Sequence, residues 1–141
     1  MPAMERAELS RDGIRTKLTR VKGGKTVKQF AAAQSENGFT VWRSWDEPGG
    51  YRDQMHAAAR NHRGIAKLVP LGTTYQGREL LALKLTAGAR GLRDGRRPAV
   101  LYSSTQHARE WIANEVNRRL MNWYIDRWRA NDREISRLLQ R

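Results

Sequence analysis

The segment Pro98–Tyr102 (PAVLY) constrains the fold of this chain more than any other. It is a short apolar run without charge, which is the profile of a strand buried on both faces. A polar turn follows it, and a long amphipathic helix is predicted to begin near Ala113. The apolar face of this helix is expected to comprise Val116, Leu120, Trp123, Tyr124 and Trp128. A buried strand that leads into a helix is typical of an α/β domain.

A helix and a β-hairpin are predicted upstream of this strand. The helix is indicated by side chains that recur at helical spacing and stop before Gly64. These side chains are Tyr51, Met55, Ala58 and His62. Ile65–Leu71 and Leu80–Leu85 are apolar runs separated by turn residues, which predicts an antiparallel pair. At the other end of the chain, Asp132 is predicted to N-cap a short helix, Arg133–Gln140.

Composition excludes several classes of protein. The chain has 141 residues, with 27 Lys and Arg, 14 Asp and Glu, and no Cys. The absence of Cys excludes a disulfide scaffold and a Cys-ligated zinc module. No apolar run approaches the roughly 18 to 20 residues that a membrane span needs, and no stretch typical of a secretory signal follows Met1.

The positive charge is concentrated near the start of the chain. Seven Lys and Arg lie between Arg11 and Lys28, against one acid, Asp12. One hypothesis is therefore a non-catalytic basic module that binds nucleic acid or another polyanion. A basic protein from an Arg-rich proteome accounts for the same charge without any such partner.

His107 and Glu110 are the residues with the clearest chemistry. They follow the predicted buried strand, at the carboxyl end where the sites of α/β sheets gather. An imidazole nitrogen and a carboxylate oxygen at this spacing can reach one ion when the segment turns toward a helix, and zinc takes both ligand types. Taken alone, however, the spacing is also typical of a solvated Glu near a His.

The surrounding sequence resembles the zinc carboxypeptidases of the carboxypeptidase A/B type. Pro98–Ile112 (PAVLYSSTQHAREWI) is similar to the family's H-A-R-E-W-I segment, which follows a buried strand and opens a long helix. Leu71–Leu85 (LGTTYQGRELLALKL) is similar to its G-x-S/T-x-x-G-R hairpin. The resemblance covers Tyr51–Arg141. It implies the first part of a mixed α/β sheet domain (helix, β-hairpin, buried strand, long helix), truncated before the remaining central strands.

The resemblance implies a metallocarboxypeptidase, which uses Zn²⁺ to hydrolyse the C-terminal peptide bond of a peptide or protein. In this interpretation His107 and Glu110 are the first two zinc ligands. Arg109 lines a substrate subsite and holds a peptide carbonyl. Trp111 and Ile112 are expected to pack the long helix against the sheet.

The resemblance also implies that most of the catalytic set is missing. The family's third zinc ligand, a His, and its general base, a Glu, lie downstream of the part that is matched. No catalytic residue is therefore assigned, and the chain is expected to be inactive alone. His56 and His62 are poor substitutes for the third ligand, because His56 is expected on a solvated face and His62 on an apolar stripe. A degenerate, inactive relic of the family is the alternative.

Domain organisation and location follow from the same resemblance. Residues 1–50 are expected to be a basic N-terminal extension or the end of a pro-segment, and residues 51–141 the N-terminal part of the catalytic domain. Secretion of the full-length protein is implied, and the signal is expected upstream of this chain. Neither a membrane nor nucleic acid is expected as a partner. The chain alone is expected to be marginally stable or to self-associate through an exposed sheet edge, because the sheet lacks neighbouring strands.

Overall fold

The structure is a computed structural model and describes residues 10–15, 17, 20, 21, 23–27, 29, 30, 41, 43–107 and 109–141. The chain divides into two units, Met1–Trp42 and Arg43–Arg141. In the first unit, Arg20 and Thr26 form an isolated antiparallel bridge. The second unit contains the helices and strands that position the candidate site.

Helix α3 (Tyr51–Asn61) is the first long element of the second unit. Its N-cap is Gly50, where a Cβ would lie 2.2 Å from the carbonyl oxygen of Ser44, so the turn into the helix requires glycine. Asp53 in the first turn accepts a hydrogen bond of 2.9 Å from the backbone N–H of Gly49, the residue before the N-cap. This places a negative charge at the positive end of the helix dipole. The predicted stripe is confirmed in that Ala58 is buried.

Strands β1 (Ala66–Thr73) and β2 (Glu79–Leu85) form the predicted antiparallel hairpin. The register shifts between Pro70 and Gly72, and the intervening Leu71 is exposed. A β-bulge is favourable beside Pro70, because proline has no backbone N–H to donate to the neighbouring strand. One side of β1 packs against α3, and no further strand pairs with β2 among the described residues.

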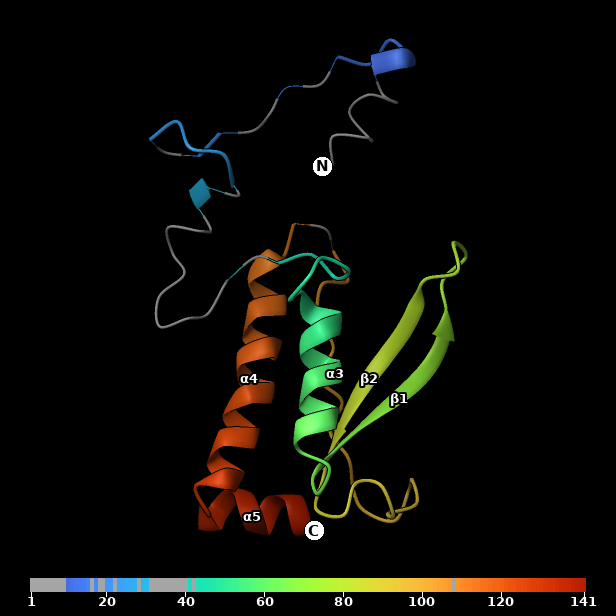
Figure 1. Cartoon of the computed structure of the whole chain (residues 1–141), viewed down its shortest axis with the longest axis vertical. Helices are drawn as coiled ribbons and strands as arrows, with labels where there is room; N and C mark the ends of the chain where they lie inside the picture. Colours follow the sequence, from blue (N-terminus) through green and yellow to red (C-terminus); the bar gives the residue numbers. More distant parts are fainter. Residues whose placement is uncertain are drawn as a thin grey trace. The chain divides into compact units, whose positions relative to one another are not determined.

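Helix α4 (Trp111–Arg129) runs beside α3 in the same direction, and α5 (Arg133–Gln140) crosses near their far ends (Figure 1). The predicted break between α4 and α5 is confirmed. The Asp132 carboxylate caps α5, because it accepts hydrogen bonds from the backbone N–H groups of Glu134 at 3.0 Å and Ile135 at 3.1 Å. These bonds satisfy donors that a helix N-terminus leaves without intrahelical partners.

The loop after β2 ties the hairpin to the end of α5. The carbonyl oxygen of Leu139 accepts hydrogen bonds from the backbone N–H of Ala87 at 2.8 Å and from the hydroxyl of Thr86 at 3.0 Å. The Arg97 guanidinium donates a third, also at 3.0 Å. The last carbonyls of a helix have no intrahelical donor, so these contacts stabilise the C-terminus of α5.

The core of the second unit is small. Its buried centre consists of Ala58 from α3, Ile65 before β1 and Ile125 from α4. Partly buried apolar side chains pack around this centre, namely Leu83, Leu85, Met121 and Trp128. Both long helices and the hairpin therefore share one core, and the fold class is mixed α/β, as predicted.

Pro98–Tyr102 is not a strand, so this prediction is wrong. Val100 is 75% exposed and Leu101 is 82% exposed. A strand buried on both faces requires neighbouring strands and covering helices, and only β1 and β2 form a sheet among the described residues. The segment instead contacts α4, where the hydroxyls of Tyr102 and Tyr124 are 3.5 Å apart.

The buried face of α4 also differs from the prediction. Val116 and Trp123, both expected in the core, are 54% and 45% exposed, whereas Ile125 is 4% exposed. Trp111 and Ile112, expected to pack against the sheet, are 50% and 63% exposed. The helix carries apolar side chains on two sides, and α3 with the hairpin covers only one of them.

Candidate metal site

His107, Arg109 and Glu110 lie in the turn that enters α4. The backbone N–H of Glu110 donates to the carbonyl oxygen of His107 at 3.0 Å, which closes this turn. The N–H of Ala113 then donates to the carbonyl oxygen of Glu110 at 3.0 Å as the helix begins. Glu110 occupies the N-cap position, but its carboxylate makes no capping hydrogen bond. All three side chains are exposed, so they are accessible to a ligand from solvent.

A hydrogen-bonded anchor holds the segment before this turn. The Asn114 side-chain oxygen, in α4, accepts hydrogen bonds from the hydroxyls of Thr105 and Ser104. Gln106 donates to the hydroxyl of Ser103 at 2.8 Å. Thr105 has φ of 65°, a left-handed conformation that is strained for a β-branched residue. The backbone strain therefore lies two residues before His107, where the chain changes direction toward the helix.

The donor types at this turn fit zinc, but the donor number does not. Imidazole nitrogen and carboxylate oxygen are both zinc ligands, and a catalytic zinc takes three protein ligands. Over residues 43–107 and 109–141 and the described part of the N-terminal unit, no group of three or more His, Asp or Glu could hold a metal. His62 and His56 therefore do not complete a site with His107 and Glu110.

His56 differs from the prediction in another respect. We expected a solvated side chain, but it is half-buried, and its Nε2 atom is buried without a hydrogen-bond partner among the described residues. Packing of α3 against β1 accounts for the difference, because the imidazole lies in the pocket between these two elements.

A buried ionic network joins the first residue of α3 to the second turn of α4, and sequence reasoning did not identify it. The side chains of Glu115 and Arg118 are each 3% exposed, and Arg118 donates to Glu115 at 3.0 and 2.7 Å. The Tyr51 hydroxyl donates to the other carboxylate oxygen at 2.9 Å. Burial, together with this bond to a carboxylate, raises the pKa of Tyr51. The network connects α3 to the helix that follows Glu110.

The only sequence signal for this network was the spacing of opposite charges at i and i+3. The same spacing occurs at Asp126 and Arg129 in the same helix, where the side chains are 68% and 67% exposed and 4.0 Å apart. Spacing alone does not separate a buried pair from a solvated one.

Comparison with known proteins identifies the family of the segment that contains this turn. The zinc carboxypeptidase family matches residues 51–141, which include the candidate site. The chain belongs to this family. The resemblance inferred from the two sequence motifs is thereby confirmed.

Two relatives show how much of a zinc carboxypeptidase this chain covers. Zinc carboxypeptidase A 1 of Drosophila melanogaster is 27% identical over 95 residues, which cover 67% of this chain and 22% of the relative. The zinc carboxypeptidase of Saccharothrix mutabilis subsp. capreolus is 27% identical over 106 residues, which cover 75% of this chain and 23% of the relative. The chain thus spans less than a quarter of the length of either relative. No solved structure matches it significantly.

Proposed function

We propose that this chain contributes the first two metal ligands of a zinc-dependent carboxypeptidase, which hydrolyses the C-terminal peptide bond of peptides or proteins. The observation that carries the proposal is the exposed turn His107–Glu110 at the start of α4, within the segment matched to the family. Residues 51–141 are the N-terminal part of the catalytic domain in this proposal. Residues 1–50 are a basic extension or the end of a pro-segment.

His107 and Glu110 would hold the metal through the imidazole and the carboxylate. Bound zinc polarises a carbonyl group and lowers the pKa of its water. The closed turn keeps the two donors three residues apart on one short segment, which reduces the entropy lost when they converge on an ion. The Asn114 anchor fixes the direction in which this segment enters the helix.

Arg109 is the proposed substrate-binding residue. It lies between the two ligands and is exposed, so its guanidinium is available to a peptide carbonyl beside the metal. A guanidinium presents five N–H donors and always carries a charge, which suits it to orienting a polarised carbonyl oxygen. Its role is to bind and orient the substrate, and no proton transfer is assigned to it.

The proposal includes inactivity of the chain alone. With two protein ligands the metal is held weakly, and no carboxylate in the described residues completes the site as a third ligand. The third ligand and the general base are proposed to come from sequence that this chain does not contain. Secretion of the whole protein belongs to the same proposal. None of the helices in the described part of the chain has the length and hydropathy of a membrane span.

Zinc titration by calorimetry tests the ligand assignment. We expect weak one-to-one binding, and His107→Ala and Glu110→Gln should each lower the affinity at least about tenfold, because each removes one metal–ligand bond. His62→Ala and Glu134→Gln are matched controls outside the turn and should leave the affinity unchanged. Equal affinity in all four variants would refute the assignment of His107 and Glu110.

The polyanion-binding module remains the second candidate, carried by the seven cations between Arg11 and Lys28. It predicts affinity for a polyanion that falls steeply with salt and does not depend on His107. Absence of both zinc and polyanion binding would favour the inactive relic.

A further inference from the structure

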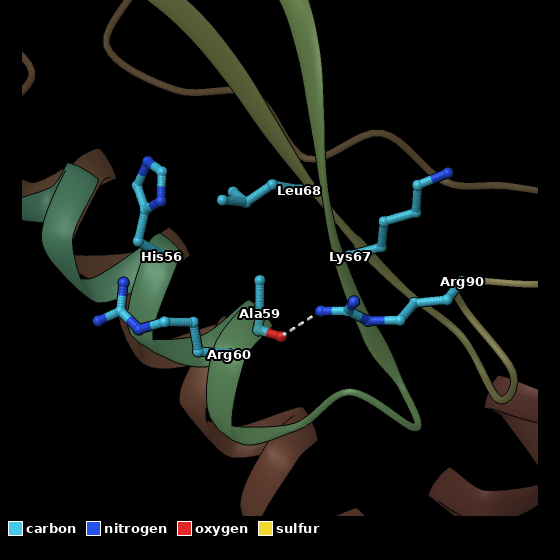
Figure 2. Close-up of a pocket in the computed structure, with 6 residues that line it drawn as sticks. All are labelled: His56, Ala59, Arg60, Lys67, Leu68 and Arg90. Carbon is cyan, nitrogen blue, oxygen red and sulfur yellow. Dashed lines mark hydrogen bonds between the residues drawn. The ribbon is translucent and has the colours of Figure 1, made fainter.

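A basic pocket lies away from the His107–Glu110 turn, between α3, β1 and the loop after β2. It has a volume of about 450 Å³ and is lined by His56, Ala59, Arg60, Lys67, Leu68 and Arg90 (Figure 2). Three of the six residues that line the pocket are Lys or Arg, and none of the six is Asp or Glu. A concave site with this charge selects against cations and favours anions.

The chain around this pocket is also basic. Between Arg60 and Arg97 there are nine Lys and Arg against two acids, Glu79 and Asp94. Both acids are already engaged, since Glu79 pairs with Arg52 at 3.5 Å and Asp94 with Lys84 at 2.6 Å. Asp94 also interacts electrostatically with Lys67, so the two acids offset only part of the local positive charge.

The cations that line the pocket have no ion-pair partner of their own. Arg60, Lys67 and Arg90 make no ion pair with any carboxylate of the described residues. Arg90 donates one hydrogen bond, of 3.3 Å, to the carbonyl oxygen of Ala59. A guanidinium has five donors, so this cap at the end of α3 occupies a small part of its capacity.

The side chains differ in how they face the pocket. Figure 2 shows the Arg90 guanidinium directed toward Ala59, with the Arg60 guanidinium and the His56 imidazole on the α3 side. The Lys67 ammonium points away from α3, so its stem lines the pocket and its charge acts from a greater distance. Arg90 is thus the charged group directed into the pocket, and Arg60 lines it from the opposite, α3 side of Ala59 (Figure 2).

His56 supplies an independent sign of a ligand. Its Nε2 atom is buried and has no hydrogen-bond partner among the described residues. Buried polar atoms are almost always paired with protein, water or a bound ion, so an orphaned atom at a pocket needs an explanation. A neutral imidazole also supplies a donor and an acceptor, which adds a neutral contact to the charged ones.

We propose that this pocket binds a tetrahedral oxyanion, a phosphate or sulfate group, through Arg60 and Arg90. Guanidinium groups bind such oxygens through paired, charge-assisted hydrogen bonds. The volume lies within the range of about 300–1,000 Å³ typical of ligand pockets, so the group can be carried by a larger molecule. The site is separate from the proposed zinc ligands and does not depend on them.

Titration of the whole chain with inorganic phosphate, followed by amide NMR, tests the proposal. At constant ionic strength, we expect saturable shifts at the lining residues. Arg60→Gln should weaken binding roughly five- to tenfold, since it removes a charge-assisted contact. Arg63→Gln is the matched control, with the same charge change at an exposed position that does not line the pocket.

Further variants keep the test decisive. Arg90→Gln also removes the hydrogen bond from Arg90 to the carbonyl oxygen of Ala59, so its effect on binding is not a clean measure of the lost charge. Lys67→Gln is therefore measured as well, and it should lower the phosphate affinity less than Arg60→Gln does. Parallel titrations with inorganic sulfate and with polyphosphate distinguish the source, because tighter binding of polyphosphate that Arg60→Gln weakens assigns the group in this pocket to a polymer. Shifts that do not saturate, or equal losses in Arg60→Gln and Arg63→Gln, would overturn the proposal. His107→Ala should bind phosphate normally, which separates this result from that of the zinc test.

Discussion

Replacement of Glu115 by Gln should strongly destabilise the second unit. The Glu115 and Arg118 side chains are each 3% exposed and are joined by two hydrogen bonds. Glu115→Gln removes the negative charge and leaves the Arg118 guanidinium buried. Breaking a buried ion pair from one side costs about 3–5 kcal/mol. The Gln side chain retains the shape of Glu and its amide oxygen can still accept a hydrogen bond. We therefore expect the free energy of unfolding to fall by about 3 kcal/mol, near the lower end of this range.

Urea denaturation followed by circular dichroism measures this loss. With a slope of about 1–3 kcal/mol per molar, the midpoint should fall by roughly 1–3 M. The matched control is Asp126→Asn in the same helix, because Asp126 and Arg129 have the same spacing but are 68% and 67% exposed. The control should change the free energy of unfolding by less than about 0.5 kcal/mol.

A milder variant keeps the reasoning testable if Glu115→Gln does not fold. Tyr51→Phe removes only the hydroxyl that donates to Glu115 at 2.9 Å. A hydrogen bond to a charged group contributes about 1.5–3 kcal/mol, and the half-buried position of Tyr51 favours the lower value. Equal midpoints for Tyr51→Phe, Glu115→Gln and Asp126→Asn would refute the claim that burial makes this network stabilising.

Three further predictions concern other parts of the second unit. Asp132→Ala should lower the thermal midpoint and Asp132→Asn should largely preserve it, as measured by circular dichroism. The backbone N–H of Ile135 holds the pKa of Asp132 below its ordinary value of 3.8, so this stabilisation is present above that pH and is lost as pH falls below it. Gly50→Ala should lower the free energy of unfolding by about 1–3 kcal/mol, because its Cβ would clash with backbone oxygens. The control is Gly64→Ala, whose Cβ meets no atom within 4 Å and should leave the free energy of unfolding unchanged. Equal melting temperatures for the two variants would contradict the clash. Leu101→Lys should weaken any self-association seen by sedimentation, since Leu101 is 82% exposed, and unchanged association would exclude this surface.

Local sequence signals predicted the elements of the second unit well. The helical stripe before Gly64, the two apolar runs of the hairpin and the cap at Asp132 all correspond to observed elements. Each of these depends on residues close in sequence: helical spacing, strand length and turn residues, or a carboxylate two or three residues before the N–H groups that it caps. The H-x-x-E pair was also found this way, because both members lie on one turn.

Features that depend on distant partners were predicted poorly. Pro98–Tyr102 has the composition of a buried strand, but its Val100 and Leu101 side chains are exposed. The apolar pattern of α4 indicated Trp123 as a core residue, although the covered side carries Ile125. Periodicity identifies apolar sides of a helix without stating which side a neighbour covers.

The sequence by itself determined the mixed α/β order, the family and the position of the proposed ligand pair, because motif spacing and periodicity are properties of neighbouring residues. Only the tertiary structure decided which groups are buried. It placed Tyr51 against Glu115, which lies 64 positions further along the chain, and it placed Arg90 beside the end of α3. Burial removes water from charged and polar groups, so the stabilising network and the basic pocket both depend on packing between elements that are distant in the sequence.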